Sequence, residues 1–313
     1  MRSVVNKATT LLVVTGFLFA GCSTVSSSVS TTLKTTLPPP STTVPPTTTT
    51  TTEQPGWTPV STVGGAIVVD SQAVTEPDGH VVTVFRFRAT RARFALHAGS
   101  TDPPVPASTI GSDSGPAIGP DEAPALVAAF NGGFKTSSGS GGFELDSRVI
   151  VPLQAGVASL VIDANGSAHV GIWDEGLPTP GEQVVSVRQN LAPLVANGQT
   201  SPSIADIGAW GSTLGGGAAV ARSSLGEDTA GDLIYAASMD AVPDDLASAL
   251  ISAGGVTGME LDINPEWVQL ASASTPGGVL SAGIPGQNRP SDQYQVGWTV
   301  LPRDASGQGP TRG

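Results

Sequence analysis

The stretch VPDDLASALISAGGVTGMELDIN, residues 242–264, predicts a helix that leads directly into a strand. A proline and two acidic residues stand at the start of the helix, and Gly254 is placed to end it. The strand carries Glu260, Asp262 and Asn264 at every second position. Side chains two residues apart in an extended chain share one face. The spacing therefore predicts either a buried strand with a polar cluster or a functional site.

Short β-like runs dominate the chain after residue 56. They lie at 64–70, 80–89, 91–99, 157–173 and 184–195. DANG at 163–166 separates two alternating segments and predicts a hairpin, because Asn and Gly tolerate positive φ. A second helix is predicted over DEAPALVAAF, residues 121–130, with Asp121 as its N-cap. The expected fold class is α+β: a mixed or antiparallel sheet with packed helices in a single domain.

The N-terminus predicts export. An apolar run from Leu11 to Ala20 follows two basic residues, and it is too short for a permanent spanning helix. FAGC at 19–22 resembles the bacterial lipobox, which implies cleavage before Cys22, a diacylglycerol on its sulfur and attachment to the outer face of a membrane. Cys22 is the only cysteine, so no disulfide competes for it. Because Phe19 differs from the usual Leu, cleavage with secretion and no lipid remains the alternative.

The domain organisation follows from composition. Residues 1–22 form the predicted signal peptide, and residues 23–56 are mostly Ser, Thr, Pro and Val. Such a segment cannot bury enough apolar surface to offset its ordering entropy, so we expect a disordered stalk. The folded domain is expected at 57–303, with a flexible tail at 304–313. The formal net charge of −12 argues against nucleic acid or an anionic membrane face as a partner.

Several common chemistries are excluded because their motifs are absent. The sequence has no G-x-S-x-G elbow, P-loop, G-x-G-x-x-G fingerprint or H-E-x-x-H motif. His80, His97 and His169 are scattered along the chain, and we expect solvated or structural roles for them. Neither a zinc site nor a cysteine nucleophile is expected.

Three polar patches remain, and they come in a particular order. They are Asn131 in FNGGFK, Arg222 in VARSSLGEDTAGDLIYAAS and Asp262 in GMELDINPEW. With the helix that ends in Gly before the third patch, this order resembles the phosphodiester glycosidase family, from about Ala66 to Leu301. The family's best-known enzyme removes N-acetylglucosamine from a phosphodiester. Where the family has two glycines after the aspartate, this chain has Ile263 and Asn264, which bears on how closely a ligand can approach.

The resemblance implies hydrolysis of a sugar-1-phosphodiester at its anomeric carbon. The sugar ring becomes oxocarbenium-like in such a reaction, and a phosphate monoester is already a good leaving group. Asp262 is our candidate nucleophile or base, with Glu260 or Glu266 as the second acid or base. Carboxyl groups ~5 Å apart would favour retention at the anomeric carbon, and groups ~6.5–9.5 Å apart would favour inversion.

Substrate binding is expected from other polar side chains of the patches. Arg222 matches phosphate oxygens bidentately. Asn131, held in a turn by Gly132 and Gly133, is expected to donate to a phosphate or a sugar hydroxyl. Further binding candidates are Arg188, Asn190 and Asn264.

Each candidate also has a structural interpretation. Asn131 suits the αL conformation before a glycine. Arg222 suits a cross-strand pair with Glu227 or Asp228, which would contribute little if exposed. For Asp262, Asn264 and Glu266 the alternative is a metal site, in which their oxygens hold a Ca²⁺ or Mg²⁺ ion. No other cofactor is indicated.

The sequence thus predicts an exported, lipid-anchored hydrolase that cleaves a sugar-1-phosphodiester in a cell-envelope glycan or conjugate. The expected partners are a carbohydrate phosphate or cell-wall glycan and, through the lipid, the membrane. The alternative is a non-catalytic glycan-binding lipoprotein on the same fold, in which LDIN at 261–264 marks lost turnover.

Overall fold

The computed structural model describes residues 56–99, 102, 118–211, 217–289 and 297–303. The predicted signal peptide with Cys22, the stalk up to residue 55 and the tail at 304–313 lie outside the described residues. The chain divides into compact units at 1–48 and 49–313, and all described residues belong to the second. Among them, no helix is both long enough and apolar enough to cross a bilayer.

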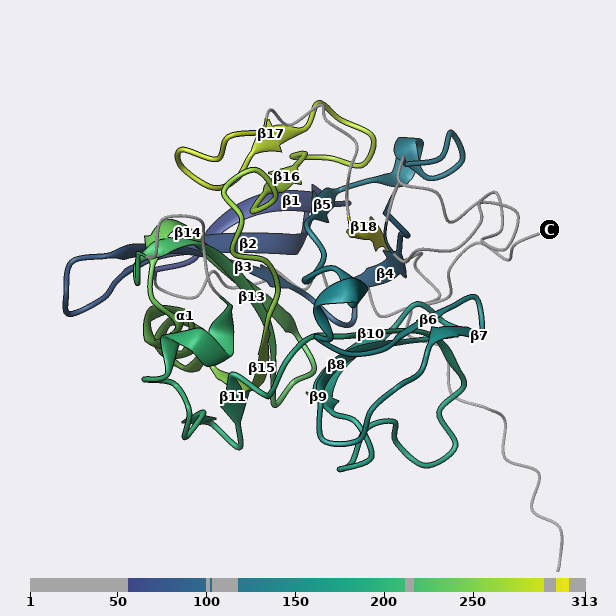
Figure 1. Ribbon diagram of the computed structural model, residues 1–313. Helices are drawn as coiled ribbons and strands as arrows, with labels where there is room; N and C mark the ends of the chain where they lie inside the picture. Colours follow the sequence, from purple (N-terminus) through teal and green to yellow (C-terminus); the bar gives the residue numbers. More distant parts are fainter. Residues whose placement is uncertain (1–55, 100–101, 103–117, 212–216, 290–296, 304–313) are drawn as a thin grey trace, which may run out of the picture. The chain divides into compact units, whose positions relative to one another are not determined.

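The largest of the three sheets in the described fold has eight strands (Figure 1). Its strands run in the order β1-β2-β3-β14-β13-β15-β11-β12, and neighbours pair antiparallel. The bounds are β1 (Thr58–Val63), β2 (Ala66–Thr75), β3 (Val81–Phe87), β14 (Leu233–Ala241), β13 (Val220–Asp228), β15 (Gly255–Glu260), β11 (Val195–Ala196) and β12 (Gln199–Thr200). The runs predicted at 64–70 and 80–89 form β2 and β3.

Both faces of this sheet are covered at its centre, which explains why the central strand β14 is apolar at most of its positions. Along β14, Leu233 and Tyr235 belong to the core that the sheet shares with the rest of the β structure. Ile234 and Ala236 belong to a second core on the opposite face. Successive side chains of a strand point to opposite faces, so a continuous apolar run is buried on both sides.

The helix α1 (Pro243–Ser252) covers one face of the sheet and packs against β14 and β15 (Figure 1). Its first turn is capped because the Asp245 carboxylate accepts the backbone N–H of Val242 at 2.8 Å. Gly254 follows its end with φ 100°, a conformation that favours glycine. Leu246 and Leu250 are fully buried on its apolar side. This helix forms where the sequence predicts it.

Two five-stranded antiparallel sheets complete the described fold. One has the order β7-β6-β10-β8-β9, with β7 (Arg148–Val151), β6 (Phe143–Leu145), β10 (Val184–Gln189), β8 (Ala158–Asp163) and β9 (Ala168–Ile172). The other has the order β17-β16-β5-β18-β4, with β17 (Ser281–Ala282), β16 (Leu270–Ser272), β5 (Ala128–Phe130), β18 (Trp298–Pro302) and β4 (Ala92–Leu96). The predicted DANG hairpin joins β8 to β9, and the Asp163 carboxylate accepts the N–H of Asn165 at 2.8 Å in its turn.

The expected α+β class is wrong. The described residues form a mostly β structure of three antiparallel sheets with one α-helix. The difference arises at 121–130, where Ala123–Ala125 forms one turn of 3-10 helix (η2) and β5 follows instead of a second helix. Strand β5 pairs with β16 on one edge and β18 on the other, and Phe130 is fully buried. Pairing on both edges outweighs the helix propensity of its alanines.

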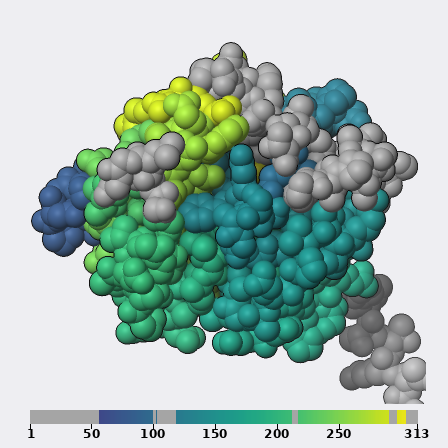
Figure 2. Space-filling model, viewed as in Figure 1, coloured from purple at the N-terminus to yellow at the C-terminus, as the bar shows by residue number. Residues whose placement is uncertain are grey.

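The remaining short elements are two more turns of 3-10 helix, η3 (Thr136–Ser138) and η4 (Ile207–Trp210). The space-filling view shows segments from the range 118–190, in teal, lying against the green segments that follow them in the chain (Figure 2). Segments from different parts of the chain therefore lie against one another at the surface, and the candidate site is formed where such segments come into contact.

Candidate functional site

A pocket of about 880 Å³ lies where the ends of strands from all three sheets meet. Its lining comes from the turn after β5, the strand β10, the segment after β15, the η4 region and Gly297. The ionisable side chains that line it are His97, Asp102, Lys135, Arg188 and Asp262. Lys135 is the only lysine after Lys34, so the pocket holds the one lysine of the folded domain.

Asp262 lies just beyond the end of β15, half-buried in the pocket wall. Its Oδ1 accepts the N–H of Asn264 at 2.8 Å, and its own N–H donates to Ser223 Oγ at 3.1 Å. Burial raises the pKa of the Asp262 carboxyl to about 6, against the lowering effect of nearby N–H groups and of Arg188 and Lys135. A carboxyl that titrates near neutral pH is suited to act as a base or as a nucleophile.

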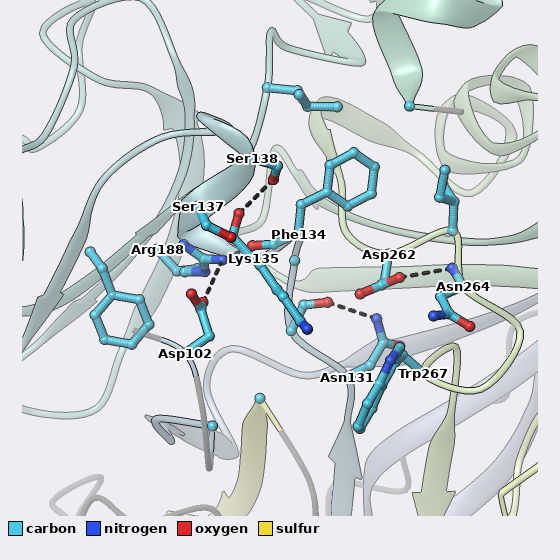
Figure 3. Close-up of a pocket in the computed structure, with 18 of the residues that line it drawn as sticks. Asp102, Asn131, Phe134, Lys135, Ser137, Ser138, Arg188, Asp262, Asn264 and Trp267 are labelled. Carbon is cyan, nitrogen blue, oxygen red and sulfur yellow. Dashed lines mark hydrogen bonds and ion pairs between the residues drawn. The ribbon is translucent and has the colours of Figure 1, made fainter. Parts of the chain in front are cut away.

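Two cations lie beside Asp262. Figure 3 shows Lys135 extending between the Arg188–Asp102 pair and Asp262. Arg188 is buried; its Nη2 donates to the carbonyl of Phe134 and lies 3.6 Å from Asp102 Oδ2. Burial lowers the pKa of Arg188 while the charges of Asp102 and Asp262 raise it, and a guanidinium stays charged at neutral pH.

The second terminal nitrogen of Arg188, Nη1, has no hydrogen-bond partner in the described part of the chain. A buried donor of a charged group without a partner costs free energy. Asp102 holds the guanidinium from the other side, and its Oδ1 accepts the N–H of Thr136 at 2.9 Å.

Asn131 lines the pocket, but its side chain is bonded within the protein. Its Nδ2 donates to Ser223 Oγ at 2.8 Å and to the carbonyl of Gly132 at 2.8 Å. Its Oδ1 accepts the Tyr235 hydroxyl at 2.8 Å and the N–H of Gln269 at 3.2 Å. The amide thus ties the turn after β5 to β13 and β14, and through Ser223 to the backbone of Asp262.

The turn after Asn131 is closely packed. A Cβ on Gly133 would lie 3.0 to 3.2 Å from side-chain atoms of Asn190. Gly297 packs against Gly132, and a Cβ on Gly297 would lie 2.3 Å from the nitrogen of Gly132. Asn190 is fully buried; its Oδ1 accepts the N–H of Phe134 at 3.1 Å and its Nδ2 donates to the carbonyl of Glu260 at 2.7 Å. Asn190 therefore joins the NGGFK turn to the LDIN segment.

Arg222 and Glu260 form a buried ion pair and neither lines the pocket. Arg222 Nη1 lies 2.6 Å from Glu260 Oε1 and donates to the carbonyl of Trp210 at 3.0 Å. Burial raises the pKa of Glu260 to about 7, although Arg222 opposes this. The strand ends at Glu260, so the alternation that would have placed Glu260 and Asp262 on one face does not continue.

Asn264 lines the pocket, and Glu266 is exposed outside it. Asn264 Oδ1 accepts the N–H of Glu266 at 2.9 Å, as Asp262 Oδ1 accepts the N–H of Asn264, so the segment contains two successive side-chain-capped turns. Glu266 Oε1 accepts from Asn288, a residue of a later segment, at 3.1 Å. Elsewhere in the described structure, possible metal ligands converge within 4.8 Å at Asp78, His80 and Asp245, outside the pocket lining.

The sequence did not single out four of the lining residues, Lys135, Asp102, His97 and Trp267, as part of the functional site. Lys135 lies in FNGGFK and Trp267 lies in GMELDINPEW. Because Lys135 is the only lysine of the folded domain, its rarity could have marked it as a candidate. His97 was expected to be structural or solvated; it is buried, with Nε2 3.1 Å from Thr299 Oγ1. Asp102 lies in a Pro- and Ser-rich stretch with no local pattern to mark it.

Comparison with known proteins gives distant similarities. No family model matches the chain, and no curated protein matches it. Among solved structures it is similar to the zebrafish N-acetylglucosamine-1-phosphodiester alpha-N-acetylglucosaminidase (NAGPA) catalytic domain auto-inhibited by pro-peptide, at 16% identity and a TM-score of 0.47, covering 79% of this chain and 86% of that one. It is also similar to a hypothetical protein from Synechocystis, at 13% identity and a TM-score of 0.39, covering 78% of this chain and 63% of that one. Similarities this distant carry no argument about activity.

Proposed function

We propose that the protein is a hydrolase that binds a sugar-1-phosphodiester in this pocket and cleaves it at the anomeric carbon. The observation that supports this best is the presence in one pocket of Asp262, with a pKa of about 6, beside the cations Lys135 and Arg188. The ordered motifs of the sequence point to the same chemistry. The proposal includes export and lipid anchoring, with a cell-envelope glycan or conjugate as substrate; these parts rest on the N-terminal sequence.

The phosphate end of the substrate would lie at Lys135 and Arg188. A phosphodiester carries one negative charge and two non-bridging oxygens, and a guanidinium offers paired donors to such oxygens. Arg188 lines the pocket and brings such a guanidinium to this end of it. Arg188 thus takes the role that the sequence assigned to Arg222, which is committed to Glu260.

The sugar end would lie at Asp262. One oxygen of this carboxylate is engaged by Asn264. The other either removes a proton from a water that attacks the anomeric carbon, or attacks that carbon itself to form a glycosyl ester that water then hydrolyses. The bond from the anomeric carbon to the bridging oxygen breaks, and the electron pair leaves with the phosphomonoester. Lys135 and Arg188 stabilise that anion, so the departing oxygen needs no acid. Glu260 does not line the pocket and is not required for this step.

The test uses the full-length chain, a panel of sugar-1-phosphodiesters and an assay for released phosphomonoester, with and without Ca²⁺ or Mg²⁺. Asp262→Asn should lower turnover by about 10²- to 10⁴-fold, the usual contribution of a positioned acid or base. Asp174→Asn, at an exposed aspartate outside the pocket, is the matched control and should keep full activity.

Two results would contradict the proposal. One is normal turnover by Asp262→Asn with the fold intact by circular dichroism. The other is no turnover of any diester by the unmodified protein, which would favour the non-catalytic glycan-binding alternative.

A further inference from the structure

Trp267 is one of three aromatic side chains that line the pocket, together with Phe134 and Phe143. It lines the pocket and is half-buried, in the same segment as Asp262. Asn131 also lines the pocket, and Figure 3 shows the indole on the same side of Lys135 as Asp262. The phosphate chemistry proposed above makes no use of an indole. Its position calls for a ligand with an apolar surface next to its charged group.

Arg289 holds this indole in place from one face. The Arg289 guanidinium carbon lies 3.9 Å from the centre of the Trp267 ring, and Arg289 Nε donates to the carbonyl of Glu266. The backbone N–H of Trp267 donates to the carbonyl of Asn264 at 2.8 Å. A cation over one ring face leaves the opposite face for another partner.

The segment that carries Arg289 is itself braced. The Gln287 side chain donates to the carbonyl of Arg289 at 3.1 Å, and Asn288 donates to the carboxylate of Glu266 at 3.1 Å. The indole is therefore fixed before any ligand arrives, which reduces the entropy lost on binding.

We propose that Trp267 is the platform on which the sugar ring of the substrate stacks, so that the pocket selects pyranosyl phosphates over phosphates in general. The inference rests on the proposed function for the position of the phosphate. One face of a pyranose presents C–H groups, while its hydroxyls point to the rim, so it pairs with an aromatic ring without burying polar atoms. Stacking on Trp267 keeps the ring beside Asp262 while the phosphate reaches Lys135 and Arg188.

The experiment measures binding without turnover, by calorimetry on the full-length chain with Asp262→Asn as the common background. The probes are α-D-glucose 1-phosphate, N-acetyl-α-D-glucosamine 1-phosphate and inorganic phosphate. Trp267→Ala should weaken at least one sugar phosphate about tenfold, the scale of one lost aromatic contact, and change phosphate affinity less than twofold. Trp267→Phe keeps a stacking face and should stay within about threefold of the background.

Two further variants separate stacking from a general disturbance. Trp57→Ala is the matched control, because Arg86 lies 3.9 Å over that ring in the same kind of pair outside the pocket. It should leave all three affinities unchanged. Trp267→Leu fills much of the same space without an aromatic face, and should lose sugar phosphate affinity as the alanine variant does.

Equal sugar phosphate affinity in the background protein and in both Trp267→Ala and Trp267→Leu overturns the platform while leaving the hydrolase proposal intact. An equal loss for inorganic phosphate also overturns it, since the effect is then not on the sugar. Selective loss of sugar phosphate binding together with no diester turnover by the unmodified protein supports the platform and refutes the hydrolase. Binding of no sugar phosphate by the background protein overturns the platform, while turnover of a diester by the unmodified protein decides the hydrolase separately.

Discussion

Replacing Arg222 with methionine should destabilise the fold and leave the phosphate site intact. Arg222 is 1% exposed, and its Nη1 contacts both the Glu260 carboxylate and the carbonyl of Trp210. The substitution leaves Glu260, which is 0% exposed, without its countercharge. A phosphate-binding arginine would give the opposite result, with affinity lost and stability kept.

The size of the effect follows from the burial of both charges. Removing one partner of a buried ion pair costs about 3–5 kcal/mol, a large part of the 5–15 kcal/mol that stabilises a typical domain. Substituting both residues, Arg222→Met with Glu260→Leu, removes both buried charges and should recover most of that loss, to within about 1–2 kcal/mol of the unmodified protein. The difference between the stability loss of the double variant and the sum of the losses of the two single variants is a sharper test than the loss in Arg222→Met alone.

The pH dependence of the single variant has a definite sign. Burial already raises the pKa of Glu260 above its ordinary value of 4.5 to about 7, and losing Arg222 raises it further. The folded state then keeps a proton that the unfolded state releases above pH 4.5, so stability falls as pH rises from there through the folded pKa. Arg222→Met should therefore be less stable at pH 8 than at pH 5.

Urea unfolding followed by tryptophan fluorescence at these two pH values measures both effects. Arg148→Met, at an exposed arginine, is the control and should leave the midpoint unchanged. An Arg222→Met protein with the midpoint of the unmodified chain and weakened phosphate binding would refute the buried-pair reasoning and return Arg222 to the ligand site.

Three other predictions concern single groups. The kcat/KM of the proposed hydrolysis should fall as pH drops below about 6, because Asp262 must be ionised and its pKa is raised to about 6; a pH profile without that limb contradicts the assignment. Gly297→Ala should cost about 1–3 kcal/mol in urea unfolding and reduce turnover, since the new Cβ would lie 2.3 Å from the nitrogen of Gly132 and the turn must move. In an NMR titration, His80 should show a pKa above 6.5 because of its bond to Asp245, and Asp245→Asn should lower that pKa. The His80–Asp245 contact stabilises the fold below pH 6.5, and this stabilisation disappears as pH rises through the folded pKa of His80.

Local sequence patterns predicted the elements that show regular alternation of side chains or that carry turn and helix-end residues. Alternation located β2 and β3, the Asn-Gly turn located the β8–β9 hairpin, and the end signals located α1. LVAAF at 126–130 has no such pattern, because all five residues are buried and the last three form β5, which is paired on both edges. Which structure it adopts is decided by β16 and β18, more than a hundred residues away, and no local signal carries that information.

The site residues also divide into those that a local sequence signal marks and those whose contacts depend on the folded chain. Asp262 and the turn after Asn131 carry local turn signals, and both line the pocket. The partner of Arg222 depends on where β15 ends and on the register of β13 against it, so the sequence offered Glu227 or Asp228 where the structure has Glu260. Asp102 reaches the pocket from a stretch without periodicity, and only the folded chain reveals its contact with Arg188.

The bond between Asp262 Oδ1 and the N–H of Asn264 makes the two oxygens of this carboxylate chemically unequal. Because Oδ1 already accepts the N–H of Asn264, we infer that a proton taken up near pH 6 goes to Oδ2. That one atom then changes from hydrogen-bond acceptor to donor while the side chain keeps its rotamer. Reversing the polarity of a single fixed atom requires no lid and no rearrangement of the walls around it.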